Sequence, residues 1–194
     1  MQGPKLNSKD VASAADKFLK AYHSPNKLPI PIEEIVEIKM GIALYAVPGI
    51  KPLLGIDAFI SSDFTQITVD EKSLLKFPER TRFSIAHEIG HLILHQDWYK
   101  KYGPQNIDDY LTFHERIDIN SYKFIEIQAH TFAGLVLVPK DELLSQIKLK
   151  LGRIPNREAP EILIPVANDL LDIFQVSGDV MLRRLQREEI VKSI

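Results

Sequence analysis

Residues 82–95 read RFSIAHEIGHLILH, and this stretch decides how the rest of the chain is interpreted. Its apolar residues recur at steps of three and four, which is the period of a helix with one buried face. Pro78 suits the first turn of such a helix, because its missing N–H is not needed there. The spacing therefore predicts an amphipathic helix from Pro78 to about Gln96.

Two histidines lie four residues apart on this helix, at His87 and His91. Positions i and i+4 face the same way, so both imidazoles can bind one metal ion. Glu88 lies beside them, where a carboxylate can take a proton from water and later return it. Zinc suits nitrogen and oxygen ligands of this kind. A chance match is the alternative, expected in roughly one shuffled chain in a hundred, but the amphipathic setting favours a metal site.

A catalytic zinc site needs a third protein ligand. The metzincin pattern would place a histidine six residues after His91 and a glycine three residues after it, but this chain has Asp97 and Leu94 there. His95 shares the face of His91, but it lies about 12 Å along the helix axis from His87. All three histidines cannot reach one ion at that separation. His95 is therefore expected to pack or to orient a ligand.

Glu126 is the best candidate for the third ligand. It lies on a second predicted helix, from about Ser121 to Val138, which Pro139 ends. His130 shares its face, and small residues nearby would let this helix approach its neighbour closely; they are Ala129, Ala133 and Gly134. A glutamate on a helix is usually solvated when taken alone. Its place on this second helix is what favours Glu126.

The remaining segments predict a small sheet and further helices, hence an α+β fold. Strands that are antiparallel in part are expected at 42–47, 55–60 and 65–69. Helices are expected after a cap at Asn7 or Ser8, from Pro31 to Gly41, and at about 139–152, 166–174 and 178–191. The segment 97–120 is polar, aromatic and irregular, as expected of a lid or binding loop. The strand at Thr65–Asp70 is expected to be exposed, so that an extended substrate could pair with it.

Composition sets limits on the class of protein. The chain has 194 residues, no cysteine and a net charge of −2. A thiol nucleophile and a disulfide scaffold are excluded, and any transition metal must use His, Asp or Glu. Neither a signal peptide nor an apolar run long enough for a membrane span is found, so we expect a cytoplasmic protein. Mixed charges disfavour direct nucleic-acid binding. A single domain over 1–194 is expected, with a helical extension (1–26), a core (27–139) and C-terminal helices (140–194).

Four segments resemble, in order and spacing, the ImmA/IrrE family of zinc metallo-endopeptidases. Residues 82–95 resemble its active-site helix, and Glu126–Pro139 resembles its second motif. Pro29–Ile35 with Gly41 and Ile42 is similar to its first helix and strand. Phe174–Ser177, followed by Leu182–Leu185, is similar to its C-terminal helix pair. The resemblance covers about residues 27–190.

This resemblance implies a zincin-like metallopeptidase fold with a small sheet and an otherwise mostly helical chain. It implies that His87, His91 and Glu126 bind one Zn(II) ion, or Mn(II) or another divalent ion, and that Glu88 is the general base. The implied substrate is a helix-turn-helix repressor, often of the Xre type, whose cleavage derepresses stress-response or mobile-element genes. His130 departs from the family, which more often has Asn or Asp at this position.

Two other functions are left open. The chain could bind a repressor without cutting it, with a structural or vestigial metal site. Alternatively, Asp169–Leu185 could be a DNA-binding helix-turn-helix, although a packed helical hairpin is favoured because its second helix lacks a basic face. Candidate oxyanion partners are Tyr99, Tyr102, Tyr110, Tyr122 and His114, each of which is also suited to packing. Trp98 is expected to anchor a loop.

Overall fold

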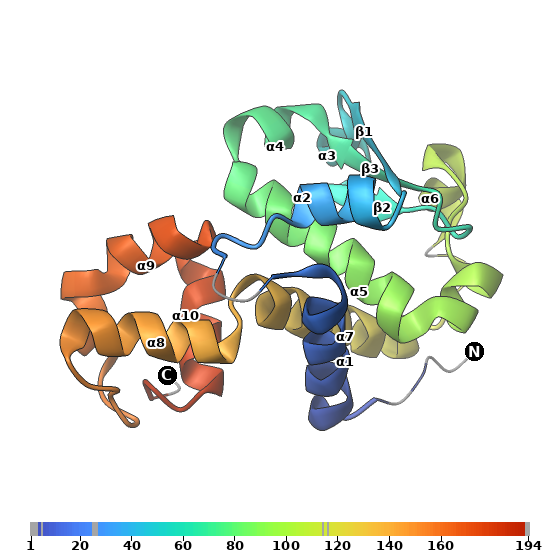
Figure 1. Cartoon of the computed structure of the whole chain (residues 1–194). Coiled ribbons are helices and arrows are strands. Elements are labelled where there is room, and N and C mark those ends of the chain that lie inside the picture. The colour runs from blue at the N-terminus through green and yellow to red at the C-terminus, as the bar shows by residue number, and fades with distance from the viewer. Residues whose placement is uncertain (1–3, 5, 25–26, 114, 116, 193–194) are drawn as a thin grey trace.

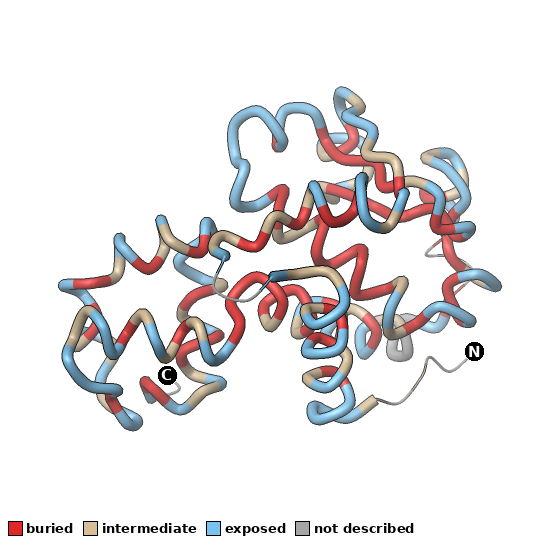
Figure 2. The backbone as a smooth tube through the Cα atoms, in the orientation of Figure 1, coloured by how far each residue is buried: buried red, intermediate tan, exposed pale blue. Residues whose placement is uncertain are grey.

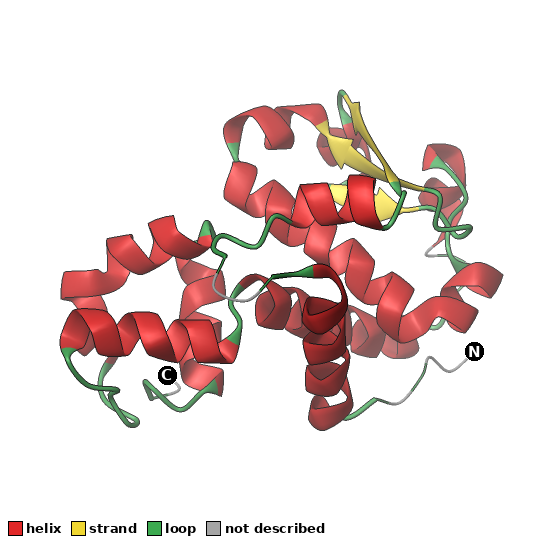
Figure 3. Cartoon of the chain, in the orientation of Figure 1, coloured by secondary structure: helices red, strands yellow, loops and turns green. Residues whose placement is uncertain are grey.

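A computed structural model describes residues 4, 6–24, 27–113, 115 and 117–192, with the backbone alone at 119–121. The fold is α+β: a small sheet lies against a long central helix, and helices make up most of the rest (Figures 1 and 3). The elements of the first half are α1 (Ser8–Tyr22), α2 (Ile32–Glu34), the π-helical turn η1 (Ile35–Lys39), β1 (Ala43–Val47), α3 (Ile50–Leu54), β2 (Ala58–Ile60), β3 (Gln66–Asp70), α4 (Glu71–Lys76) and α5 (Pro78–Tyr102). Those of the second half are α6 (Ile107–Phe113), α7 (Ile119–Leu137), α8 (Lys140–Leu151), the 3₁₀ helix η2 (Pro160–Val166), α9 (Ala167–Phe174) and α10 (Gly178–Arg187).

The sheet is mixed, in the order β1-β3-β2. β3 pairs in parallel with β1 and antiparallel with β2, which confirms a sheet that is antiparallel in part. Because β3 has a strand on each side, the expectation that Thr65–Asp70 is an exposed strand for substrate is wrong. β1 and β2 are instead the two edge strands, and the backbone of β2 reaches α5 through Ile60.

Several helices begin or extend where none was expected. The segment 97–120, predicted to be irregular, contains the last turns of α5, all of α6 and the start of α7. α5 continues to Tyr102 beyond a break in helical geometry at His95 (φ −127°, ψ 21°). α3 begins after Gly49, and its Pro52 lies in the first turn, where a missing N–H costs no helical hydrogen bond.

The C-terminal helices pack beside the end of α7 (Figure 1). Arg184 of α10 is buried, and its Nε donates a hydrogen bond to the carbonyl of Val138 at 2.9 Å. The same guanidinium pairs with Glu188 at 2.8 Å. Arg184 therefore stabilises the packing of α10 against α7 and does not extend into solvent. The division of the chain at residues 26 and 139 stays a prediction.

Among the helices that the structure describes, none combines the length and apolar character needed to cross a bilayer. The centre of α5 is instead buried inside the protein, between the sheet and α7 (Figure 2).

α5 and α7 approach each other at Gly90. A Cβ atom at Gly90 would lie 3.0 Å from Cα and 3.2 Å from the carbonyl oxygen of Ala129. These are backbone atoms, so they cannot move aside as a flexible side chain could. α1 covers the other side of α7, where the rings of Phe18 and Phe132 meet edge to face at 5.7 Å. The absence of a side chain at Gly90 thus sets the spacing of the two helices that contain His87, His91 and Glu126.

We predict that Gly90→Ala lowers the free energy of unfolding by about 1 kcal/mol or more, because the added methyl forces the helices apart. Gly134→Ala is the matched control. Its Cβ would meet only the side chain of Arg184, at 3.4 Å, so its higher helix propensity should stabilise the protein by up to about 1 kcal/mol. Urea denaturation measures both values. Equal stabilisation by the two substitutions would contradict the close approach.

A cluster of charged and polar side chains holds the residue before β2 to the helices α3, α4 and α5. Asp57 accepts hydrogen bonds from Lys51 Nζ at 2.6 Å, Arg80 Nε at 2.7 Å and Ser73 Oγ at 2.8 Å. Burial opposes ionisation of Asp57, but these hydrogen bonds outweigh it and hold the pKa of the carboxyl below its usual value. Ionised Asp57 therefore stabilises the folded state.

We predict that Asp57→Asn lowers the free energy of unfolding by about 1–3 kcal/mol at pH 7, the range for hydrogen bonds to a charged group. The folded-state pKa is depressed, so this contribution is complete above the unfolded pKa of about 4 and is lost as the pH falls through the folded value. The difference from wild type should shrink in acid. Asp172→Asn, the same change at an exposed position, is the control. A difference that is independent of pH would exclude the charge as its cause.

Candidate metal centre

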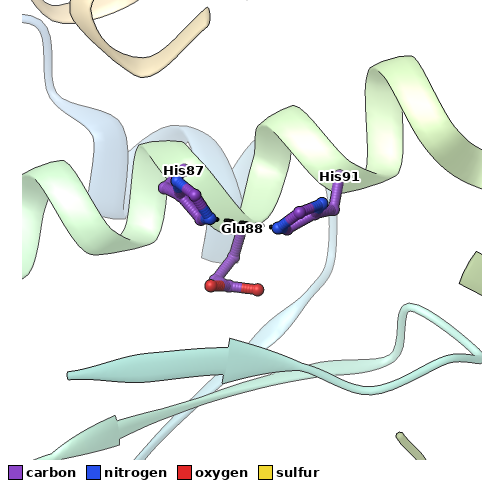
Figure 4. A group of neighbouring side chains, drawn as sticks. All are labelled: His87, Glu88 and His91. Atoms are coloured by element: carbon purple, nitrogen blue, oxygen red, sulfur yellow. Dashed lines mark hydrogen bonds between the residues drawn. The ribbon is translucent and has the colours of Figure 1, made fainter. Parts of the chain in front are cut away.

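His87 and His91 lie on the face of α5 that is turned toward α7 and the sheet. Their Nε2 atoms are 3.0 Å apart, and the rings meet edge to face with centroids 4.7 Å apart. Figure 4 shows the two rings turned toward each other and Glu88 extending toward the strands. His87, Glu88 and His91 are all buried, and each offers a ligand atom within 4.8 Å of the others. The helical spacing predicted from the sequence therefore brings these three side chains together.

Glu126 reaches the same point from α7. Its Oε2 lies 3.2 Å from His87 Nε2, and its Oε1 lies 3.2 Å from His91 Nε2. Neighbouring ligand atoms of a tetrahedral site with bonds of about 2.0–2.1 Å are about 3.3 Å apart. Two imidazole nitrogens and one carboxylate thus have the chemistry and the separation that fit one small divalent cation.

The Glu88 carboxylate points away from this contact and toward β2. Its Oε2 accepts a hydrogen bond from the backbone N–H of Ile60 at 2.9 Å. The bond joins residues 28 apart in sequence, and no periodicity in the sequence indicated Ile60 as a partner. It holds the carboxyl between the two imidazoles and the edge strand.

The two glutamates have opposite electrostatic surroundings. Burial opposes ionisation of Glu126, but hydrogen bonds with His87 and His91 outweigh it and hold its pKa well below the usual range. Burial instead raises the pKa of Glu88 to about 8. Neighbouring groups whose pKa values are pushed apart in this way are typical of divided acid–base roles. Glu126 has the properties of a permanent anion, whereas Glu88 can hold or release a proton near neutral pH.

The two histidines also differ. Burial would lower the pKa of His87, but hydrogen bonding to Glu126 and the charges of Glu126 and Glu88 raise it. Burial lowers the pKa of His91. A negative pocket therefore favours positive charge at His87, as expected where a cation can bind.

His95 lies behind His91 and does not contact the other donor atoms. The Nδ1 atoms of the two rings are 3.2 Å apart, and His95 Nε2 lies 2.8 Å from Gln128 Oε1. Burial lowers the pKa of His95 to about 3, so its ring is neutral. This position agrees with the expectation that His95 orients a ligand or packs. Gln128 was not singled out from the sequence, although its two-residue spacing from Glu126 placed it on the same helix.

A cavity of about 200 Å³ opens onto these side chains. Residues 55–59, which lead into and along the edge strand β2, line this cavity together with several aromatic side chains. Tyr99 stacks on His91 at 4.7 Å, and Tyr122 is hydrogen-bonded to both Tyr110 and Glu126. Tyr99, Tyr110 and Tyr122 thus line the cavity, as candidate oxyanion partners should.

The other aromatic candidates lie elsewhere. Tyr102 packs on Trp98, with ring centroids 5.5 Å apart, and is not among the residues that line the cavity. Trp98 also meets Phe113 edge to face, in keeping with an anchoring role. His114 lies outside the described residues.

His130 lies at the mouth of the cavity. Its ring stacks on Phe83 at 5.4 Å and meets His87 edge to face at 4.6 Å. Burial, with the charge of His87, lowers the pKa of His130 to about 4. A neutral imidazole is therefore available here as a hydrogen-bond donor or acceptor for a bound molecule.

Comparisons with known proteins show the family and the fold of this chain. A family model described as the IrrE N-terminal-like domain of the peptidase M78 family matches residues 74–186. A solved structure, a Mycobacterium tuberculosis transcriptional regulator, is similar in fold with a TM-score of 0.56 at 16% identity. The match covers 91% of this chain but only 46% of that one, so the chain spans about half its length. A search of curated proteins found no match. Because the family model covers more than half of its residues, this chain belongs to the peptidase M78 family, with an IrrE N-terminal-like domain.

Proposed function

We propose that this chain is a zinc-dependent endopeptidase in which His87, His91 and Glu126 bind the metal and Glu88 is the general base. One observation carries the proposal. Two imidazole nitrogens on one helix and the two oxygens of a carboxylate on another converge at 3.0–3.2 Å, and a second carboxyl group of opposite acid–base character lies beside them. A purely structural metal site has no use for this second group.

Zinc is the metal that suits two imidazoles and a carboxylate best, although manganese and other divalent ions accept the same set. When bound, such an ion polarises a carbonyl group and lowers the pKa of water.

The protein's own contribution centres on Glu88. Because its Oε2 accepts the N–H of Ile60, Oε1 is the oxygen left to take a proton from water and pass it to the departing amide nitrogen. Burial raises the pKa of Glu88 in the metal-free protein, so these surroundings stabilise the protonated carboxyl that follows the transfer from water. Aromatic side chains and residues of β2 line the cavity around it.

The edge strand β2 is suited to bind an extended peptide. Asp57 O accepts from Asp70 N, and Ser61 N donates to Gln66 O, so alternate residues of this strand pair with β3. The backbone N–H and carbonyl groups of the residues between them point away from β3, and Glu88 accepts a hydrogen bond from the N–H of Ile60. The backbone N–H and carbonyl of Ala58 remain on the outer side, beside the cavity. Addition of a substrate strand here would bring its backbone to Glu88.

We propose that the substrate is a helix-turn-helix repressor of the Xre type, whose cleavage derepresses stress-response or mobile-element genes. Family membership and the regulator with a similar fold support a role in transcriptional control. Direct DNA binding through α10 is disfavoured because Arg184, one of its basic residues, is buried against Val138 and Glu188.

We predict that His91→Ala and Glu126→Gln each weaken zinc binding. The loss should exceed the factor of about 10 to 100 that is typical when a residue hydrogen-bonded to a ligand is replaced. Glu88→Gln is the matched control for Glu126→Gln and should bind zinc nearly as wild type, because its carboxyl is not a ligand. Competition with a chromophoric chelator at pH 7 measures the affinities. Equal zinc affinity of Glu126→Gln and wild type would remove Glu126 from the ligand set.

We predict that Glu88→Gln abolishes cleavage in cells, because removing a general base typically slows a reaction by about 10²–10⁴-fold. A repressor encoded beside this gene would be co-expressed with the wild type or with Glu88→Gln, and its mass measured. A fragment formed by the wild type alone supports the protease and identifies the scissile bond. An intact repressor that co-purifies with both chains would favour the non-cleaving regulator.

A further inference from the structure

A groove of about 530 Å³ runs along the outer side of α1. Its apolar lining comes from the segment before α1, from α1 itself and from the long helix α5; these residues are Leu6, Ala14, Phe18, Ala21 and Ile93. Ile93 is 38% exposed, although its side chain is large and apolar. The outer side of α1 is exposed along its length (Figure 2). No other element in the described part of the chain lines this groove, so its apolar surface is open to a partner.

Two opposite charges line the same groove, at Asp10 and Lys17. They are seven residues apart on α1, which places them on one face and about 10 Å apart along the axis. Both are exposed, and no ion pair of either is found among the residues that the structure describes. Asp10 Oδ2 accepts from the backbone N–H of Asn7 at 2.9 Å, and a carboxylate has further acceptor sites for a cation. A surface that fits the groove must therefore place a cation opposite Asp10 and an anion opposite Lys17.

We propose that the groove binds the same groove of a second copy of the chain, with the two α1 helices antiparallel about a two-fold axis. In such a contact both copies use one surface, so the order of charges along α1 is reversed across the interface. A pair centred between Ser13 and Ala14 places Asp10 of each copy opposite Lys17 of the other. The charge pattern of this groove is therefore its own complement.

The same register also suits the shape of the groove. Leu6 lies opposite Ala21 of the second helix, so apolar side chains meet at both ends of the contact. Ser13 and Ala14 in the middle are small, and helices with small residues at their contact pack about 8 Å apart. Apolar and charged residues are thus matched by one arrangement of the two helices.

The end of the groove is held in place by α7. Gln128 Nε2 donates to the carbonyls of Leu6 at 3.0 Å and Pro4 at 3.4 Å. The segment before α1 is therefore fixed before a second copy binds, which reduces the entropy that binding must overcome.

The proposed dimer leaves the metal centre accessible. Ile93 follows His91 by two residues, which is about 200° around the helix. The groove and the histidine rings therefore lie on opposite sides of α5, and each copy keeps its cavity away from the interface. The proposal does not depend on the proposed function, and metal-free protein is enough to test it.

The first experiment measures the oligomeric state of the metal-free chain by sedimentation equilibrium. One helix and one side chain of α5 make a small interface, so we expect a dissociation constant of about 10–100 µM. Because both ion pairs are exposed, about 1 M salt should weaken the dimer severalfold. A chain that remains a monomer at about 500 µM, well above this range, would overturn the proposal.

The second experiment reverses the charges of the groove. Asp10→Lys and Lys17→Asp each place two pairs of like charges at the contact, so each variant alone should dimerise at least about 10-fold more weakly. An equimolar mixture should regain the affinity of the wild type, because each variant supplies the charge that the other lacks. Asp16→Lys is the matched control. Asp16 is exposed on the same helix but does not line the groove, so the dimer should be unaffected.

Folding of each variant is checked by circular dichroism and urea denaturation, because Asp10→Lys removes a capping hydrogen bond of α1. Lys17→Asp leaves this cap intact, so wild-type affinity in that variant alone would overturn the proposal. A mixture of two folded variants that stays as weak as each variant alone would also overturn it, since the interface would then lie elsewhere. Restored affinity in the mixture supports the antiparallel contact.

Discussion

The contact between the backbones of two helices at Gly90 and Ala129 is the constraint on which the site depends. Nε2 of His87 and of His91 and the carboxylate of Glu126 meet at 3.0–3.2 Å only because α5 and α7 approach this closely. An added side chain between the helices would separate the two halves of the donor set. The packing of the core and the chemistry of the centre are therefore consequences of the same missing Cβ atom.

Burial affects the pKa values of two neighbouring glutamates in different ways. Glu126 is ionised in spite of burial because two imidazoles surround it, whereas Glu88 has one backbone N–H as its partner. Hydrogen bonds and charge offset the free-energy cost of desolvating the carboxylate of Glu126. They offset this cost only partly at Glu88. Identical side chains thus differ in their pKa values through their neighbours alone.

Much of this centre could be predicted from the sequence, because its main elements are periodic. The helical spacing of His87, Glu88 and His91 and the long helix around Glu126 are local signals. The short helices α3 and α4 give no such local signal, since the prolines and glycines beside α3 indicate loops equally well. β3 lies in the centre of the sheet because it pairs with both β1 and β2. The alternation of residues within β3 does not indicate which strands will pair with it. Hydrogen bonds such as Glu88 to Ile60 join distant elements and leave no local pattern.

The hydrogen bonds of Gln128, which lies 2.8 Å from His95, have a consequence for how such sites evolve. Gln128 is anchored by main-chain carbonyls of Pro4 and Leu6, not by their side chains. Any residue that keeps the same backbone path can supply these acceptors, so the interaction itself places no demand on the side chains at positions 4 and 6. Covariation between aligned sequences would detect His91, His95 and Gln128 as coupled. It would not detect the N-terminal segment whose carbonyls bind Gln128.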